Sequence, residues 1–229
     1  MKLKVSKRFK KLLEVSKGKK IETIEEAIQK VKKNCTAKFD ESIDVSFNLN
    51  LKQKKDEITL RTSVNLPNGN GKKIKVAVLC EDSKIQEAKD GGADLFETDK
   101  LVNDIISGKI NFDKLVATPL MMSKMGKLGK ILGPKGLMPN PKLGTVTNNV
   151  KSIVKALKSG QIEIKNDKDG NVGASIGKKI FSDIKIQENY NSILKTILKE
   201  KPSVIKGDFI LSAFLTSTMG ISYKLKLSK

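Results

Sequence analysis

The chain has 229 residues, and 45 Lys and Arg against 25 Asp and Glu give it a formal net charge of +20. Such a surplus opposes compact folding through self-repulsion unless a polyanion neutralises it, so nucleic acid is the favoured partner. A merely solvated basic surface and an anionic membrane face are the alternatives. Histidine is absent, which excludes Cys-His and Ser-His-Asp catalytic sites and removes the usual general base and zinc ligand.

Cys35 and Cys80 are the only cysteines, and their separation suggests neither a metal cluster nor a disulfide framework. We interpret both as small buried hydrophobic residues in a reducing cytoplasm. The N-terminus lacks the apolar run of a signal peptide, and no segment approaches the roughly 20 apolar residues of a membrane span. We therefore expect a cytoplasmic protein with no membrane contact, no metal and no cofactor.

Arginine is nearly absent, because Arg8 and Arg61 are the only two. Lysine is a flexible point charge, whereas arginine offers a planar fork for bidentate recognition. Nucleic-acid binding should therefore depend on phosphate neutralisation, with little arginine-based reading of bases.

The N-terminal pattern predicts two helices and then two strands. Residues 5–15 look helical and amphipathic, and Thr23 opens a stronger helix through the capping box TIEE. Apolar and polar residues alternate over residues 43–51 and again over residues 58–66, which is typical of half-buried strands. With the polar turn KQKKDE between them, these strands are expected to form a long antiparallel hairpin.

The pattern changes after LPNGNGKK (residues 66–73), which we interpret as a linker. The apolar segments KIKVAVLC, GGADLFE and LVATP predict short strands, of the buried parallel kind where the run is continuous. Helices are predicted between them at 82–90 and 99–107, followed by a Met-rich helix and another over 146–158. This alternation indicates a small parallel α/β layer.

Longer alternating strands return after residue 160. Residues 161–178 predict a hairpin around the turn DKDG, and a helix is expected over 183–199, with two more strands in DFILSAFLTSTMG and ISYKLKL. The fold class is therefore mixed, α+β with α/β. We expect a discontinuous α+β domain of residues 1–67 and 161–229, and an α/β domain of residues 68–160 inserted into it.

The stretch GKLGKILGPKGLMPNP, residues 126–141, raises the question of a phosphate-binding loop. No register of its glycines matches G-x-x-x-x-G-K-[ST] or G-x-G-x-x-G, so a nucleotide-binding enzyme is retained only as the alternative function. Residues 121–160 hold eight Lys and no acid, whereas residues 68–120 hold eight Lys and nine acids. Gly and Pro would fix an irregular loop whose backbone can approach a partner closely; a rigid connector with a solvated basic face is the other interpretation.

The same stretch carries a family resemblance. LGKILGPKGLMPNPKLGTVT, with KFDESIDVSFNLNL, LPNGNGK, GGAD, IEIKNDKDG, IGK and STMG in order and spacing, resembles the L-one protein family of the large ribosomal subunit over essentially the whole chain. The resemblance implies a split α+β domain I and an inserted Rossmann-like domain II. It further implies a non-enzymatic protein, monomeric when free, that binds ribosomal RNA at the mobile stalk and assists release of deacylated tRNA. Bacterial members also repress translation of their own operon mRNA.

Carried over residue by residue, the family's RNA contacts centre on domain I. Phosphate neutralisation, stacking on a sugar or base, and hydroxyl or backbone contacts are the implied chemistry. These contacts fall on Lys38, Phe39, Lys165, Asp167, Lys168, Thr218, Met219 and Gly220. In the Gly-Pro-Lys stretch the candidate residues are Lys127, Lys130, Lys135, Gly133 and Gly136.

Each of these residues also has a plain structural interpretation. Phe39 and Met219 could belong to the core, TMG could be a strand end, and the lysines could be solvated charge. A free RNA-binding repressor without a ribosomal role is a third functional hypothesis, which the sequence does not separate from the first.

Overall fold

The computed structural model describes residues 6–15, 21–51, 60–203 and 205–227. The chain divides into two compact units, which are residues 1–71 with 164–229 and residues 72–163. The sequence puts the domain limits at residues 68 and 160, a few residues from these divisions. That these limits bound independently folding domains stays a prediction.

The first unit begins with two helices, α1 (Lys7–Val15) and α2 (Ile24–Lys33). Thr23 caps α2 as expected, because its hydroxyl accepts from the backbone N of Glu26 and the Glu26 carboxylate accepts from the N of Thr23. The helix buries Ala27, Ile28 and Val31, which share one face at helical spacing. The predicted start of α1 at residue 5 lies outside the described residues.

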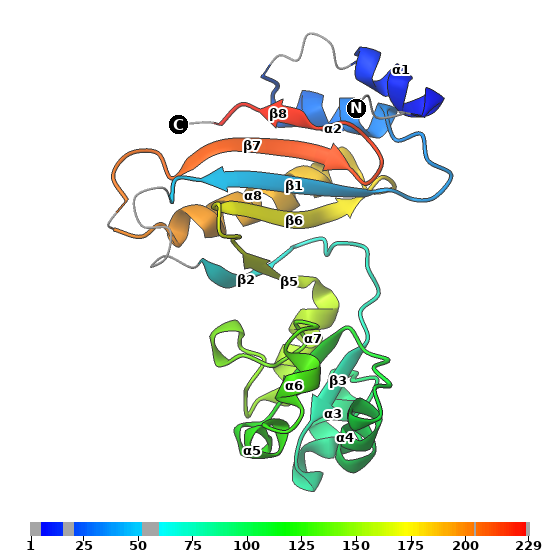
Figure 1. Ribbon diagram of the computed structural model, residues 1–229, viewed down its shortest axis with the longest axis vertical. Helices are drawn as coiled ribbons and strands as arrows, with labels where there is room; N and C mark the ends of the chain where they lie inside the picture. The colour runs from blue at the N-terminus through cyan, green and yellow to red at the C-terminus, as the bar shows by residue number, and fades with distance from the viewer. Residues whose placement is uncertain (1–5, 16–20, 52–59, 204, 228–229) are drawn as a thin grey trace. The chain divides into compact units, whose positions relative to one another are not determined.

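A four-stranded sheet in the order β6-β1-β7-β8 forms the centre of this unit (Figure 1). Its strands are β1 (Ser42–Leu49), β6 (Asn171–Lys178), β7 (Ile210–Ser217) and β8 (Tyr223–Leu225). All three pairings are antiparallel. The strand β1 therefore comes from the N-terminal segment and the other three strands from the C-terminal segment, so neither segment alone forms the sheet.

The expected hairpin of residues 43–66 is wrong. The strand β2 (Arg61–Asn65) does form, but it pairs with β5 (Gln161–Lys165) in a separate two-stranded sheet. Both edges of β1 are taken by β6 and β7, so no edge is left for β2. Alternation predicts a strand and its buried face, but it does not name the partner. The predicted turn KQKKDE lies outside the described residues.

The hairpin expected over residues 161–178 is also only partly right. The DKDG turn is present, and one antiparallel bridge joins Asn166 to Val172. Beyond that bridge the strands separate, because β5 joins β2 while β6 joins β1.

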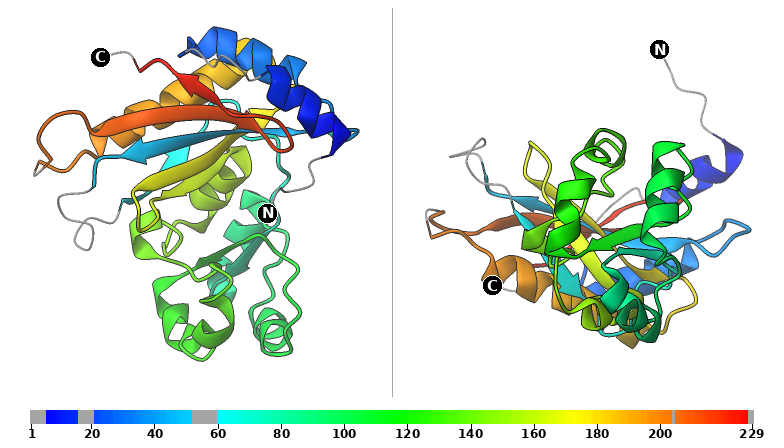
Figure 2. Two further views of the ribbon diagram at one scale, coloured as in Figure 1. Left: turned by 45° about the horizontal axis from the view of Figure 1, so that its top comes forward. Right: turned by 90° about the horizontal axis from the view of Figure 1, so that it is seen from below.

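Helices cover one face of the four-stranded sheet. The helix α2 packs on β7 and β8, and α8 (Asp183–Lys199) packs on β6. In Figure 1 α8 passes behind the strands, and Figure 2 shows α2 and α8 over the same side. The residues of β1 that face these helices are Ile43, Val45, Phe47 and Leu49, all buried. Among the described residues of this unit, no helix packs on the opposite face of the sheet.

The second unit is the expected small parallel layer. Its strands β3 (Val76–Leu79) and β4 (Lys114–Ala117) pair in parallel. Leu95 and Val146 add single parallel bridges to Ala77 and Ala117, so GGADLFE contributes a bridge and no full strand. The covering helices are α3 (Ile85–Gly91), α4 (Thr98–Ile106) and α7 (Val150–Ser159), with a 3-10 turn, η1 (Asp82–Lys84), before α3.

The Gly-Pro-Lys stretch is more helical than an irregular loop. It follows η2 (Pro119–Met121) and α5 (Met122–Met125), contains α6 (Gly129–Leu132), and ends in η3 (Pro141–Leu143). Met125, Leu128 and Leu132 lie in the core of this unit, each at most 1% exposed. The predicted Met-rich helix is present as α5, but the prediction missed α6 because Gly and Pro are poor helix formers, and the apolar anchors offset that preference.

Both cysteines are buried and free, which confirms their interpretation as small core residues. Within the described residues no helix is long and apolar enough to cross a membrane.

Candidate nucleic-acid interface

The face of the four-stranded sheet opposite α2 and α8 is polar. Its side chains come from alternate positions, because neighbouring residues of a strand point to opposite faces. From β1 and its neighbours these are Asp44, Ser46, Asn48, Asn171, Gly173, Ser175, Ser212, Phe214, Thr216 and Lys224, all exposed or half-buried. We call this set the open face. Hydroxyl and amide groups dominate it, and they can donate to or accept from a sugar-phosphate chain.

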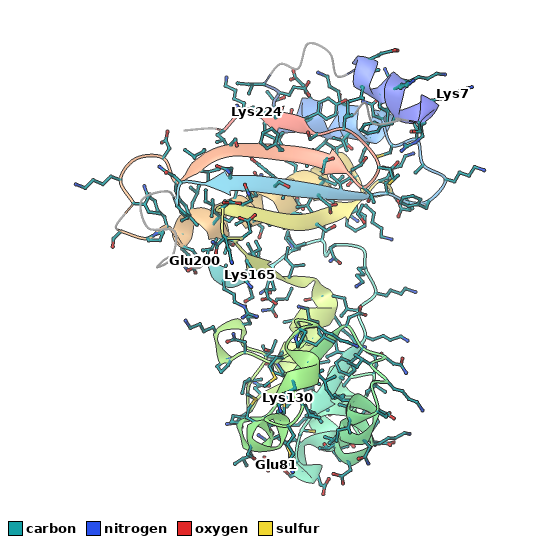
Figure 3. The ribbon with its side chains drawn as sticks, viewed as in Figure 1. Lys7, Glu81, Lys130, Lys165, Glu200 and Lys224 are labelled. Atoms are coloured by element: carbon teal, nitrogen blue, oxygen red, sulfur yellow. The ribbon has the colours of Figure 1, made fainter. Side chains whose placement is uncertain are left out.

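The middle of the open face carries a glycine. Ser46 stands opposite Gly173 on one side and Phe214 on the other. A Cβ built on Gly173 would meet no atom within 4 Å, so the surface at Gly173 is open. Lys224, labelled in Figure 3, stands opposite Phe214 on β8 and supplies the positive charge of this row.

The loops 36–41 and 217–220 meet at one end of the open face. Phe39 and Met219 are 52% and 47% exposed, so neither belongs to the core. Lys38 and Thr218 are exposed as well. The Thr218 hydroxyl accepts from the backbone N of Ser42 at 3.1 Å, which ties the second loop to the start of β1. The structure therefore brings four of the predicted contacts together and leaves their outer surfaces free.

Glu41 joins these two loops from inside. Its carboxylate is fully buried and accepts from the backbone N of Ala37 at 3.0 Å, the backbone N of Met219 at 3.1 Å and the Ser217 hydroxyl at 2.8 Å. Burial alone would raise the pKa of Glu41, but these three hydrogen bonds and the nearby charge of Arg8 outweigh it and hold the pKa below its ordinary value. The carboxylate is therefore ionised in the folded protein near neutral pH.

Arg8 joins the same loops from outside. From α1 its guanidinium donates to the Thr36 hydroxyl at 3.0 Å and to the backbone carbonyl of Met219 at 3.1 Å. Gly220 follows, and a Cβ placed there would lie 2.3 Å from the Ser217 hydroxyl oxygen. Glycine at this position is thus required by local packing, whatever contact it makes with a partner.

The turn that contains Asp167 and Lys168 lies at the other end of the sheet. The backbone N of Leu49, the last residue of β1, donates to the carbonyl of Gly170 at 2.8 Å. Asp167 shapes the turn, because its carboxylate accepts from the backbone N of Asp169 at 2.9 Å and of Asn171 at 2.7 Å. The hydrogen bond from Asn171 is the largest of the effects that lower the pKa of Asp167.

Lys168 lies in this turn and Lys165 two residues before it, and both are exposed (Figure 3 labels Lys165). The eight residues of β1 separate them from the loops at the far end by roughly 23 Å, at the usual rise per strand residue. The predicted contacts therefore form two groups, and the open face connects them. Sequence reasoning gave Asp167 a place among the contacts, but its carboxylate is already occupied by the turn.

A separate candidate lies in the second unit, in residues 121–160, which hold eight Lys and no acid. We call them the basic segment. Lys127, Lys130, Lys135 and Lys142 are exposed and have no carboxylate within 4 Å among the described residues; Figure 3 labels Lys130 on α6. Gly133 and Gly136 are also exposed, and Gly136 has a positive φ of 67°. Two other lysines of the basic segment form ion pairs within the unit: Lys151 pairs with Asp90, and Lys158 pairs with Asp94.

An open α/β layer usually binds nucleotides beyond the carboxyl ends of its strands. Glu81 and Asp82 follow β3 at that edge, and carboxylates there repel a phosphate. Among the described residues no group of three or more Cys, Asp or Glu could hold a metal ion.

Several functional candidates were missed from the sequence. Glu41 stood inside the quoted motif KFDES but was not selected, because a buried carboxylate and an exposed one look alike in sequence. The open face had a detectable signal: the polar positions between the apolar residues of β1 are all small, and NVGAS in β6 matches them. Arg8 had a weaker signal, because it is one of only two arginines in the sequence.

Taken together, the fold and its surface define a basic two-unit protein with an exposed polar sheet face in one unit and a lysine-rich segment in the other. The chain belongs to the ribosomal protein L1p/L10e family, whose model matches residues 31–221. It is therefore a ribosomal protein and not an enzyme.

Its relatives cover nearly the whole chain. The large ribosomal subunit protein uL1 of Pelagibacter ubique is 58% identical over 225 residues, which is 98% of each chain. The proteins of that name from Neisseria meningitidis serogroup C and Neisseria gonorrhoeae are each 45% identical over 225 residues, 98% of this chain and 97% of theirs.

Proposed function

We propose that this protein is a structural constituent of the large ribosomal subunit that binds ribosomal RNA at the mobile stalk through the open face and the loops at its two ends. The observation that carries the proposal is the joining of Phe39, Thr218 and Met219 into one exposed surface by the buried carboxylate of Glu41. Two segments far apart in sequence are fixed beside each other while their outer side chains stay free.

The chemistry of the interface suits RNA. Phe39 and Phe214 offer ring faces for a sugar or an unstacked base, and the serines, threonines and asparagines of the open face match 2′-hydroxyl and phosphate groups. Lys38, Lys165, Lys168 and Lys224 neutralise phosphates around it. A nearly arginine-free surface of this kind would recognise the shape of a folded RNA more than the edges of its bases.

The basic segment of the second unit supports a further contact. Lys130 lies on α6, and Lys127 and Lys135 lie in the turns on either side of it. Met125, Leu128 and Leu132 anchor this segment in the core of the unit, so the three charges are held on an ordered backbone. We assign this segment to the backbone of deacylated tRNA as it leaves the ribosome. Repression of the protein's own operon mRNA would use the open face, in competition with ribosomal RNA.

Binding of a large-subunit stalk RNA fragment, titrated against salt, tests the first proposal. We expect specific binding whose logarithm falls linearly with the logarithm of the salt concentration. Absent binding, or binding indifferent to salt, would contradict it. Co-sedimentation with ribosomes then separates a ribosomal constituent from a free repressor, which would bind the fragment yet stay in the supernatant.

The tRNA assignment needs its own variant. Replacing Lys127, Lys130 and Lys135 together by Gln should weaken binding of deacylated tRNA and leave the affinity for the stalk fragment nearly unchanged. The matched control replaces Lys84, Lys89 and Lys100, which lie in the mixed-charge half of the same unit. Equal loss of tRNA binding in both triple variants would show that net charge, and not this segment, is responsible.

A further inference from the structure

We infer that Arg8 and Glu41 form a brace that holds the loops 36–41 and 217–220 in their RNA-binding arrangement, and that Arg8 is a positioning residue and not a phosphate contact. The inference rests on the proposed function for its RNA readout. It assigns a role to the helix α1, which precedes residues 31–221, the part that the family model matches.

The two halves of the brace act on the same pair of loops. Glu41 accepts from the backbone N of Ala37 in one loop and of Met219 in the other. Arg8 donates to the Thr36 hydroxyl in the first loop and to the Met219 carbonyl in the second. Met219 is thus held through both its N–H and its C=O, which fixes the peptide planes on either side of its exposed side chain.

The choice of arginine at position 8 is itself informative. Among 45 basic residues only Arg8 and Arg61 are arginine, so lysine is the default cation of this chain. A guanidinium presents its donors in a rigid planar fork, whereas a lysine ammonium is a compact charge on a flexible stem. Two acceptors on separate loops need the fork, because it sets the distance between them. A phosphate can be neutralised by lysine, as it is elsewhere on this surface.

The directions of the side chains agree with this role. Arg8 is half-buried and Leu12, one helical turn later, is buried, so both lie on the inner side of α1. Lys7, Lys10 and Lys11 are exposed. Lys10 has neither a hydrogen bond from its side chain nor an ion pair within the described part of the chain, and it is therefore a matched control for losing one positive charge from the same helix.

The salt dependence of binding separates positioning from direct contact. Losing one phosphate contact reduces the slope of log affinity against log salt by about one unit. Arg8→Ala should lower affinity for the stalk RNA fragment about tenfold, the size of a lost charge-assisted hydrogen bond, with the slope unchanged. Lys10→Ala should change the affinity less than twofold. A reduced slope for Arg8→Ala, or equal effects of the two variants, would overturn the inference.

Arg8→Lys tests the fork. It keeps the charge but cannot hold two acceptors in a fixed geometry, so we expect it to bind as weakly as Arg8→Ala. Glu41→Gln tests the buried half of the brace. Combined with Arg8→Ala, it should reduce the RNA-binding free energy by less than the sum of the two single changes. Full affinity in Arg8→Lys, or additive losses in the double variant, would contradict a shared role.

Hydrogen exchange in the free protein tests the brace without RNA. The amides of Ala37 and Met219 both donate to Glu41, and Arg8→Ala should speed their exchange several-fold relative to Lys10→Ala. Unchanged exchange would refute the brace even if the stalk RNA binds. Faster exchange with no RNA binding by the unaltered protein would instead refute the proposed function and leave the brace standing.

Discussion

At the scale of single residues, the interface depends on polar groups that the protein satisfies from within. Glu41 and Asp167 are both carboxylates in or near predicted contact motifs, yet each is saturated by local donors. Glu41 holds the loops that carry Phe39 and Met219, and Asp167 shapes the turn that carries Lys168. These three neighbouring side chains remain exposed. The charged residues nearest a binding surface are therefore not all binding residues.

Thr218 and Met219 should separate binding from stability. Thr218→Val keeps the side-chain shape but removes the hydroxyl that accepts from the Ser42 backbone N, so it should cost about 1 kcal/mol of stability as well as RNA affinity. Met219→Ala should weaken RNA binding with little change in stability, because the side chain is half exposed. Thermal unfolding and titration of the stalk RNA measure both effects. If Thr218→Val and Met219→Ala both bound the stalk RNA as tightly as the unaltered protein, the loop 217–220 would not be part of the RNA-binding surface.

Glu41 should make the fold sensitive to acid. Its pKa in the folded protein is lowered from the ordinary 4.5, so its ionisation stabilises the fold above that value and the stabilisation is lost as the pH falls through the folded pKa. The Glu41→Gln variant should therefore unfold at a lower denaturant concentration than the unaltered protein near neutral pH. The difference in unfolding free energy between the two proteins, called the gap below, should narrow in acid. Urea unfolding between about pH 7 and pH 2 measures this gap. A gap that is constant over the range would contradict the role of the charge.

At the scale of elements, the strands were predictable and their partners were not. The alternation over residues 43–51 located β1 and its buried face correctly, and the helix over 183–199 has the predicted bounds. The pairing failed because β1 is central: partners from the C-terminal segment occupy both its edges, and local sequence carries no record of such distant partners. The open face left a signal in the short polar residues of β1 and β6, but that signal becomes a surface only once β6, β1 and β7 are known to be neighbours.

The short helices of the second unit give the next prediction. A Cβ on Gly133 would lie 2.7 Å from the backbone O of Gly129, whereas a Cβ on Gly129 would meet nothing within 4 Å. Gly133→Ala should therefore destabilise this unit by about 1–3 kcal/mol through overpacking. Gly129→Ala, its matched control within α6, should be neutral or stabilising by up to about 1 kcal/mol because alanine favours helix. Equal melting temperatures for the two variants would mean that the segment relaxes freely.

The turn at the far end of the sheet offers a matched pair of neighbouring residues. Lys168→Ala should reduce the salt slope of stalk RNA binding by about one unit without changing stability, as expected for a phosphate contact. Asp167→Asn should lower stability, because two backbone N–H groups lose a charged acceptor. Measuring slope and unfolding for both variants checks the assignment. An unchanged slope for Lys168→Ala would remove this turn from the interface.

At the scale of the whole molecule, the charge and the ordered motifs were enough to predict the family and a chain with a split segment around an inserted one. They were not enough to show how the predicted contact residues are arranged, because the two groups of these residues lie at opposite ends of one sheet. The open face connects the two groups. Together they form one surface that is long enough to follow a stretch of folded RNA.

Mapping the protein's amides by NMR, with and without the stalk RNA fragment, tests this account most directly. The account predicts shifts along the open face and at both its ends, including Ser46, Phe214 and Met219, with the outer surfaces of α2 and α8 unaffected. Shifts confined to the helix-covered side, or to only one end of the sheet, would contradict it.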